Sequence, residues 1–155
     1  MQPIDVRKQL QLDAAQEVGR IFFEYSRLDF LLWLTLRDNG EPLERAEKKI
    51  AEFHTAEKIK RLGQRLQKEL AGDAKRLQQA EDWISRAEMV REHRNSFAHG
   101  RWIPEANGLL VNVTVSRSTG QQESKTYTID QLVLVRSEAE ALQIELNKLR
   151  KGWQL

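Results

Sequence analysis

The sequence contains no cysteine, which excludes disulfide bonds, thiolate zinc sites and thiol catalysis together and fits a reducing compartment. It also lacks a long apolar run, because the longest, residues 30–34, is far shorter than the roughly 20 residues needed to cross a bilayer. The pattern of a signal peptide, basic residues followed by an apolar stretch, is missing as well. We therefore expect a cytoplasmic protein that makes no contact with a membrane.

The sequence also has no large excess of charge of one sign, because it contains 25 Lys and Arg residues and 23 Asp and Glu residues. A net charge of +2 does not mark a nucleic-acid binder, so any contact with nucleic acid has to be local. The 155 residues, 40% of them hydrophobic and 31% charged, have the length and composition of one globular domain. No repeat, low-complexity tract or linker divides it, so we predict a single domain over residues 1–155.

Apolar residues three or four positions apart predict a long first helix that begins at Asp5 or Asp13 and ends at Arg37. Its apolar face comprises Val18, Ile21, Phe22, Tyr25, Leu28, Leu32 and Leu36. After Leu28 apolar residues surround the helix, which indicates burial by the domain itself or by a partner subunit. Residues 39–40, Asn-Gly, supply the predicted stop, because both tolerate the left-handed conformation that ends helices.

Two further helices are predicted over 42–70, with an interruption near Thr55, and over 73–100. Between residues 44 and 76 the sequence has ten Lys or Arg residues against six Asp or Glu residues. The commoner meaning of such a surplus is a solvated helix face with many ion pairs. The alternative is a shallow surface that attracts phosphate.

The sequence changes character over residues 101–128. Val and Thr alternate with other residues over 109–115, a turn follows at 118–120, and 125–129 is again β-prone. This pattern predicts a β-hairpin, with Trp102 and Ile103 as a third short strand.

Thr128 and Gln131 have the spacing of a capping box and open a predicted last helix. The apolar residues of that helix form two series with a period of seven, which suits packing along another helix. The expected fold class is mainly α: an antiparallel bundle of about four helices, with a β-hairpin at about 101–128 inserted before the last helix.

Chemically informative residues are concentrated at the end of the predicted third helix, in Arg94, Asn95 and His99. Arginine offers a permanent positive fork that matches phosphate oxygens, and histidine can take and return a proton near neutral pH. Asparagine can orient either of them. Cleavage of an RNA phosphodiester needs such groups, because a base must take the proton of the ribose 2′-hydroxyl while a cation stabilises the phosphorane.

Each of these residues also has a purely structural explanation. An ion pair with Asp29 would account for Arg94, and the negative end of the helix dipole would account for His99. Asn95 could serve only as a cap or a backbone contact. In that case the chain is a non-catalytic helical module that binds a nucleotide, an RNA end or a protein partner.

Arg94-Asn95, followed by three residues, His99 and Gly100 at the end of a long helix, resembles the signature of HEPN-family ribonucleases. The layout is also similar, with a long first helix that carries an acidic residue in an apolar context, two further helices and a closing helix. The resemblance implies a metal-independent endoribonuclease that needs no cofactor and leaves a 2′,3′-cyclic phosphate on RNA.

Members of the family act as toxins or defence effectors and are often held in check by an antitoxin or another regulatory protein. They are typically homodimers whose two motifs line one cleft at the interface. Carried over to this chain, the resemblance implies that Arg94 binds and stabilises the phosphate, that His99 is the general base or acid, and that Asn95 supports them.

Helix geometry adds a condition to this expectation. At about 100° per residue, Asn95 and His99 share a face, whereas Arg94 and His99 lie roughly 140° apart. One straight helix therefore does not aim both catalytic side chains at one phosphate. We expect a two-fold dimer to bring two copies of the motif together.

Asp29 lies among apolar neighbours on the predicted first helix, where a carboxylate is costly unless it meets a cation or several donors. We expect Arg94 as its partner, with His99 as the second choice, and Glu24 as a weaker candidate for the same supporting role. Trp102, directly after the motif, is the tryptophan expected to touch substrate. No metal site is expected, because the sequence has only three histidines and no carboxylate at metal-ligand spacing.

Overall fold

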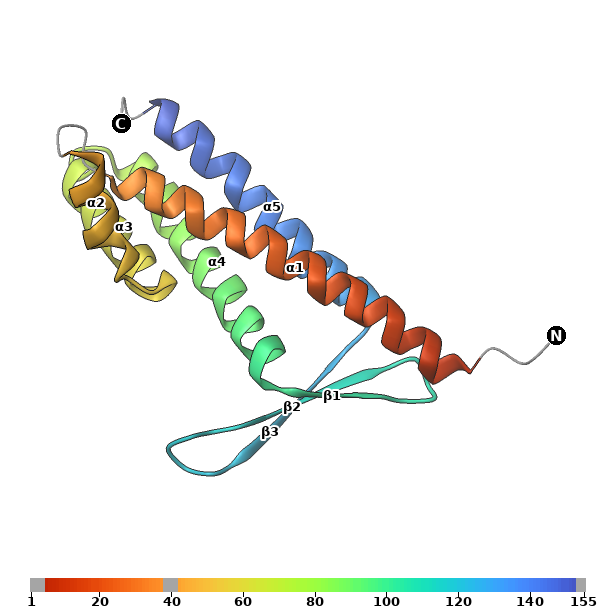
Figure 1. Ribbon diagram of the computed structural model, residues 1–155. Coiled ribbons are helices and arrows are strands. Elements are labelled where there is room, and N and C mark those ends of the chain that lie inside the picture. The colour runs from red at the N-terminus through yellow and green to blue at the C-terminus, as the bar shows by residue number, and fades with distance from the viewer. Residues whose placement is uncertain (1–4, 38–41, 153–155) are drawn as a thin grey trace.

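The computed structural model describes residues 5–37 and 42–152, in which five helices and three strands follow one another (Figure 1). They are α1 (Val6–Leu36), α2 (Leu43–Ala51), α3 (Thr55–Glu69), α4 (Ala74–His99), β1 (Arg101–Pro104), β2 (Leu110–Val115), β3 (Gln122–Tyr127) and α5 (Ile129–Gly152). The predicted mainly-α class, with a small antiparallel sheet before the last helix, is confirmed. The stop predicted at 39–40 lies outside the described residues.

Helix α1 begins after Asp5, whose carboxylate accepts a hydrogen bond from the backbone N–H of Arg7 at 3.1 Å and so caps the helix. Its buried residues recur every three or four positions, as the sequence pattern predicts. They are Leu10, Ala14, Glu17, Ile21, Tyr25, Leu28, Leu32 and Thr35. None of the described helices is long and apolar enough to span a membrane.

The predicted second helix is in fact two helices, because α2 ends at Ala51 and α3 begins at Thr55. The interruption expected near Thr55 is therefore confirmed, and the described residues contain five helices rather than about four. His54 stands at the N-cap position of α3 with an extended backbone and no side-chain cap hydrogen bond. This break turns the start of α3 towards the side of α1.

Helix α4 begins after Asp73, which caps it by accepting from the backbone N–H of Arg76 at 3.1 Å, and it ends at His99 with Gly100 as the predicted C-cap. Gly100 does not adopt the left-handed conformation that usually favours glycine there, since its φ is −81°. A side chain at position 100 is excluded because the surrounding atoms leave no space for it. A Cβ atom at this position would lie 2.4 Å from Nδ2 of the buried Asn112 and 2.6 Å from the carbonyl oxygen of Ser96.

The three strands form an antiparallel sheet in the order β1-β2-β3, with Arg101 opposite Val113 and Leu110 opposite Tyr127. The third strand suggested by Trp102 and Ile103 is therefore present. Figure 1 shows the sheet at the end of α4, close to the first half of α1. The sheet thus returns the chain to the end of the bundle where α1 begins.

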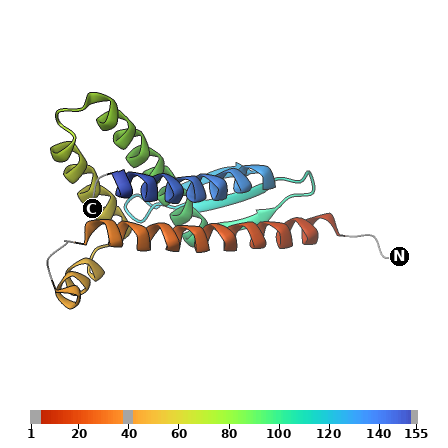
Figure 2. The same ribbon diagram turned by 90° about the horizontal axis from the view of Figure 1, so that it is seen from above.

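Helix α5 opens with the predicted capping box, because the Thr128 N–H donates to the Gln131 side chain and the Gln131 N–H donates to the Thr128 hydroxyl. It runs parallel to α1, since Arg136 bonds to Glu17 at 2.9 Å and Gln143 bonds to Glu24 at 2.7 Å (Figure 2). The expectation of an antiparallel bundle is therefore wrong for this pair of helices. The reason is the sheet, which starts α5 beside the beginning of α1.

Candidate functional site

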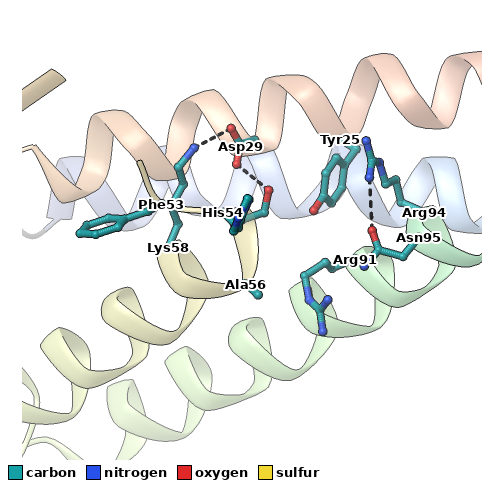
Figure 3. Close-up of a pocket in the computed structure, with 10 residues that line it drawn as sticks. Tyr25, Asp29, Phe53, His54, Ala56, Lys58, Arg91, Arg94 and Asn95 are labelled. Atoms are coloured by element: carbon teal, nitrogen blue, oxygen red, sulfur yellow. Dashed lines mark hydrogen bonds and ion pairs between the residues drawn. The ribbon is translucent and has the colours of Figure 1, made fainter. Parts of the chain in front are cut away.

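A cleft of about 480 Å³ lies between α1, the start of α3 and α4 (Figure 3). The residues that line it are Tyr25, Asp29, Phe53, His54, Thr55, Ala56, Lys58, Arg91, Arg94 and Asn95. All but Phe53 and Ala56 carry a polar group. The cleft therefore brings together two residues of the motif, Arg94 and Asn95, but His99 is not part of its described lining.

Arg94 is half-buried and rests against aromatic rings of α1. The central carbon of its guanidinium group lies 5.1 Å from the ring centroid of Phe22 and 5.2 Å from that of Tyr25, within the range of cation–π contacts. Nη1 donates to Oδ1 of Asn95 at 3.2 Å, and the buried Nε has no partner among the described residues. No described carboxylate forms an ion pair with this guanidinium group.

The partner predicted for Asp29 is wrong. Its carboxylate accepts from Lys58 Nζ at 2.7 Å and from the Thr55 hydroxyl at 2.7 Å, and pairs with neither Arg94 nor His99. The break between α2 and α3 is the physical reason, because it places a hydroxyl and a buried lysine directly against this part of α1. The carboxylate is thus satisfied, as its apolar setting requires, by residues of a different helix.

Lys58 is a residue of the site that the sequence analysis missed, although the sequence holds a signal for it. It stands four residues before Leu62 and so falls within the buried stripe of α3. A lysine at a core position needs a counter-charge, and its side chain is only 8% exposed. The buried cation of α3 thus pairs with Asp29 of α1, a carboxylate that lies among apolar neighbours in sequence.

Glu24 lies on the α5 side of α1, away from the cleft. Its carboxylate accepts from Arg27 at 2.9 Å and from the Gln143 side chain at 2.7 Å. It therefore joins α1 to α5 and does not take part in the predicted support of Arg94 or His99.

His99 is exposed at the last position of α4, one helical turn beyond Asn95 and on the same side of the helix. Arg94 turns towards that side through its hydrogen bond to Asn95. Even so, the cleft and the groove that the described residues form do not include His99 in their lining.

An apolar groove of about 720 Å³ runs beside the motif, between α1, the end of α4 and the sheet. Gln11, Ala14, Ala15, Val18, Gly19, Phe22, Phe97, Ala98, Trp102, Pro104 and Leu110 line it. Trp102 is held in this wall by a hydrogen bond from its indole N–H to the Phe97 carbonyl at 3.3 Å. Phe22, which lines the groove, also contacts the guanidinium group of Arg94, which lines the cleft.

Large apolar side chains of α1 are uncovered in the single chain. Phe23 is 72% exposed and Phe30 is 57% exposed, with the Phe30 ring stacked on Trp33 at 5.5 Å. The sequence pattern predicts burial of this helix by the domain itself or by a partner subunit, and burial by a partner stays a prediction. These side chains are available for such a contact.

A cluster of four aromatic side chains, His93, Phe97, Trp102 and Tyr127, fixes the sheet against the end of α4. Within it, Nδ1 of His93 lies 3.3 Å from the Tyr127 hydroxyl. Burial, assisted by the nearby Lys125, lowers the pKa of His93, and burial raises the pKa of Tyr127. The cluster holds the helix end that carries His99 in place.

Comparison of the chain with protein-family models, with curated proteins and with solved structures finds no match. What the site can do therefore follows from its own side chains. Its chemical groups are a half-buried cation without a described carboxylate partner, an amide bonded to that cation, and an exposed imidazole one turn away.

Proposed function

We propose that this chain is a metal-independent endoribonuclease of the HEPN type, which cleaves RNA with Arg94 and His99 and leaves a 2′,3′-cyclic phosphate. The observation that carries the proposal is the state of Arg94. The purely structural explanation of Arg94 is an ion pair with Asp29, but the Asp29 carboxylate pairs with Lys58 instead. A half-buried cation with no described counter-ion, beside a polar cleft, is suited to an anion such as phosphate.

In the proposed reaction His99 acts as the base that takes the proton of the ribose 2′-hydroxyl. The 2′-oxygen then attacks the adjacent phosphorus, and the bond from phosphorus to the 5′-oxygen breaks. The leaving oxygen takes a proton from water and His99 gives its proton back to water, so the products are a 2′,3′-cyclic phosphate and a 5′-hydroxyl. Arg94, held by Asn95, stabilises the extra negative charge of the phosphorane.

A homodimer is part of the proposal, because Arg94 lines the cleft and His99 is not part of its described lining. The uncovered Phe23 and Phe30 and the apolar groove that reaches Ala98 offer surface for a second copy. Two-fold packing there would bring two α4 ends together, so that Arg94 of one copy and His99 of the other hold one phosphate. Trp102, in the groove wall, is the proposed substrate contact.

Cleavage of RNA by the purified protein in the presence of EDTA tests the proposal. We expect His99→Ala to abolish cleavage while circular dichroism and gel filtration show an unchanged fold and oligomeric state. Asn147→Ala, an exposed position on α5, is the matched control and should cleave like the wild type. Cleavage by His99→Ala at the wild-type rate would show that the activity comes from a contaminant or from another site.

The biological role we propose is that of a cytoplasmic toxin or defence effector, controlled by an antitoxin or another regulatory protein. Under this role, expression of the wild type should slow the growth of host cells and expression of Arg94→Ala should not. The position of His99 outside the cleft favours one second candidate, a non-catalytic module that binds RNA, a nucleotide or a protein partner through the same fold. Binding of RNA without cleavage would favour the second candidate.

A further inference from the structure

The charges that line the cleft are unequal in number. Lys58, Arg91 and Arg94 are permanent cations, whereas Asp29 is the one carboxylate among the lining residues. Lys58 and Thr55 already satisfy Asp29 at 2.7 Å each, so this carboxylate does not neutralise either arginine. Figure 3 shows Lys58 on the α3 side of the cleft and the two arginines with Asn95 on the α4 side.

Arg91 retains free hydrogen-bond donors on this side. Its Nε donates to Glu88 at 2.7 Å, and Glu88 is not part of the described lining. No described hydrogen bond uses the two terminal nitrogens of Arg91, which are the fork that matches phosphate oxygens.

The start of α3 adds to the positive potential of the same cleft. His54 occupies the N-cap position without making a side-chain cap hydrogen bond, and the Thr55 hydroxyl bonds to Asp29 instead of to the helix. Among the described residues, no side chain caps the first amide N–H groups of this 15-residue helix, which lie next to the exposed His54. An anion held by Arg91 would lie near these donors.

The size and position of the cleft indicate what this anion is. A volume of about 480 Å³ with a mostly polar lining suits a phosphate and its ribose better than a large apolar group. Arg91 and Arg94 stand three residues apart, so their Cβ atoms are roughly 5–6 Å from each other and can serve two neighbouring phosphates. Arg94 and Asn95 line the same cleft as Arg91, so a strand whose cleaved phosphate lies at Arg94 can continue along the cleft to Arg91.

We infer that Arg91, together with His54 and the start of α3, binds the phosphate of a nucleotide that flanks the cleaved bond, while Arg94 holds the cleaved phosphate itself. This inference rests on the proposed function and adds a second phosphate subsite to it. The ligand is thus a segment of an RNA strand with at least two consecutive phosphates. A free nucleotide has the same chemistry, and the experiment separates the two.

The test uses a fluorescently labelled 2′-O-methyl RNA oligonucleotide, which lacks the nucleophilic hydroxyl and cannot be cleaved. Binding is followed by anisotropy over a range of salt concentrations, with AMP as the second ligand. We expect Arg91→Gln to weaken binding of the oligonucleotide about tenfold at low salt. The slope of log affinity against log salt should decrease by about 0.7.

Arg76→Gln is the matched control, because this arginine is exposed at the start of the same helix and forms no ion pair among the described residues. It should bind like the wild type, and His54→Ala should weaken binding less than Arg91→Gln. Equal effects of Arg91→Gln and Arg76→Gln would overturn the subsite. Binding of AMP as tightly as the oligonucleotide, with the same dependence on Arg91, would overturn the assignment to an RNA strand.

The two proposals fail separately. If natural RNA stays intact with the wild type but Arg91→Gln weakens binding of the 2′-O-methyl strand, the nuclease fails and the phosphate subsite stands. If RNA is cleaved and depends on His99, while Arg91→Gln binds and cleaves like the wild type, the nuclease stands and the subsite is refuted.

Discussion

Replacement of Asp29 by alanine tests how the cleft is held together. Asp29 and Lys58 join α1 to α3 through a 2.7 Å ion pair, in which the lysine side chain is 8% exposed and the aspartate side chain is 31% exposed. The substitution leaves the lysine charge buried without its partner. The native state must then either bury an uncompensated charge or rearrange the start of α3.

The loss of stability expected for Asp29→Ala lies between the losses typical of buried and of exposed ion pairs. Removal of one partner from a fully buried pair costs about 3–5 kcal/mol, whereas exposed pairs contribute about 0.2–1 kcal/mol. Because Asp29 is partly exposed to water, we expect a decrease of about 2–3 kcal/mol in the free energy of unfolding. For a chain of this size that is a decrease of roughly 4–12 °C in Tm.

The assay is a double-mutant cycle measured by urea and thermal unfolding. Asp29→Ala combined with Lys58→Met should recover most of the stability, because the methionine fills the space of the lysine stem and carries no charge. A loss below about 0.5 kcal/mol for Asp29→Ala, or strictly additive effects in the double variant, would show that this ion pair does not stabilise the native state.

Three further predictions concern the frame around the motif. Gly100→Ala should lower the free energy of unfolding by about 1–3 kcal/mol. Adding Asn112→Ala should restore only part of this loss, because the Ser96 carbonyl oxygen still lies 2.6 Å from the new Cβ. Full recovery of stability would contradict this explanation. Since burial lowers the pKa of His93, the unfolded state takes up the proton first, and the free energy of unfolding should fall as the pH drops below the ordinary pKa of 6.5. Urea unfolding at neutral pH and near pH 5 should show that the stability of His93→Gln depends less on pH than that of the wild type. Thr128→Ala should lower the free energy of unfolding by about 1 kcal/mol through loss of the capping box, and an unchanged Tm would contradict that role.

The features that the sequence predicts well are local. Helix caps need only residues close in sequence. Asp5, one of the two residues predicted to start the first helix, caps α1, and the predicted cap at Asp73 and capping box at Thr128 and Gln131 also have their hydrogen bonds. The separation of Arg94 from His99 likewise follows from helical spacing alone.

The features that the sequence does not predict depend on contacts between distant elements. The predicted partner of Asp29 is wrong because the break between α2 and α3 places Lys58 against α1. The chemical suitability of Arg94 as a cation does not determine which side chain reaches Asp29. The parallel packing of α1 and α5 depends on where the sheet returns the chain. The role of Gly100 depends on Asn112 from β2, which no local pattern reveals.

The most direct measurement is RNA cleavage by a mixture of two single variants. Arg94→Ala and His99→Ala are purified separately, each is shown to be inactive with EDTA present, and the subunits are then allowed to exchange. If Arg94 of one copy and His99 of the other form each site, mixed dimers keep one intact site, and an equal mixture should regain about a quarter of the wild-type rate. A mixture as inactive as its two components, or cleavage by His99→Ala alone, would contradict the account.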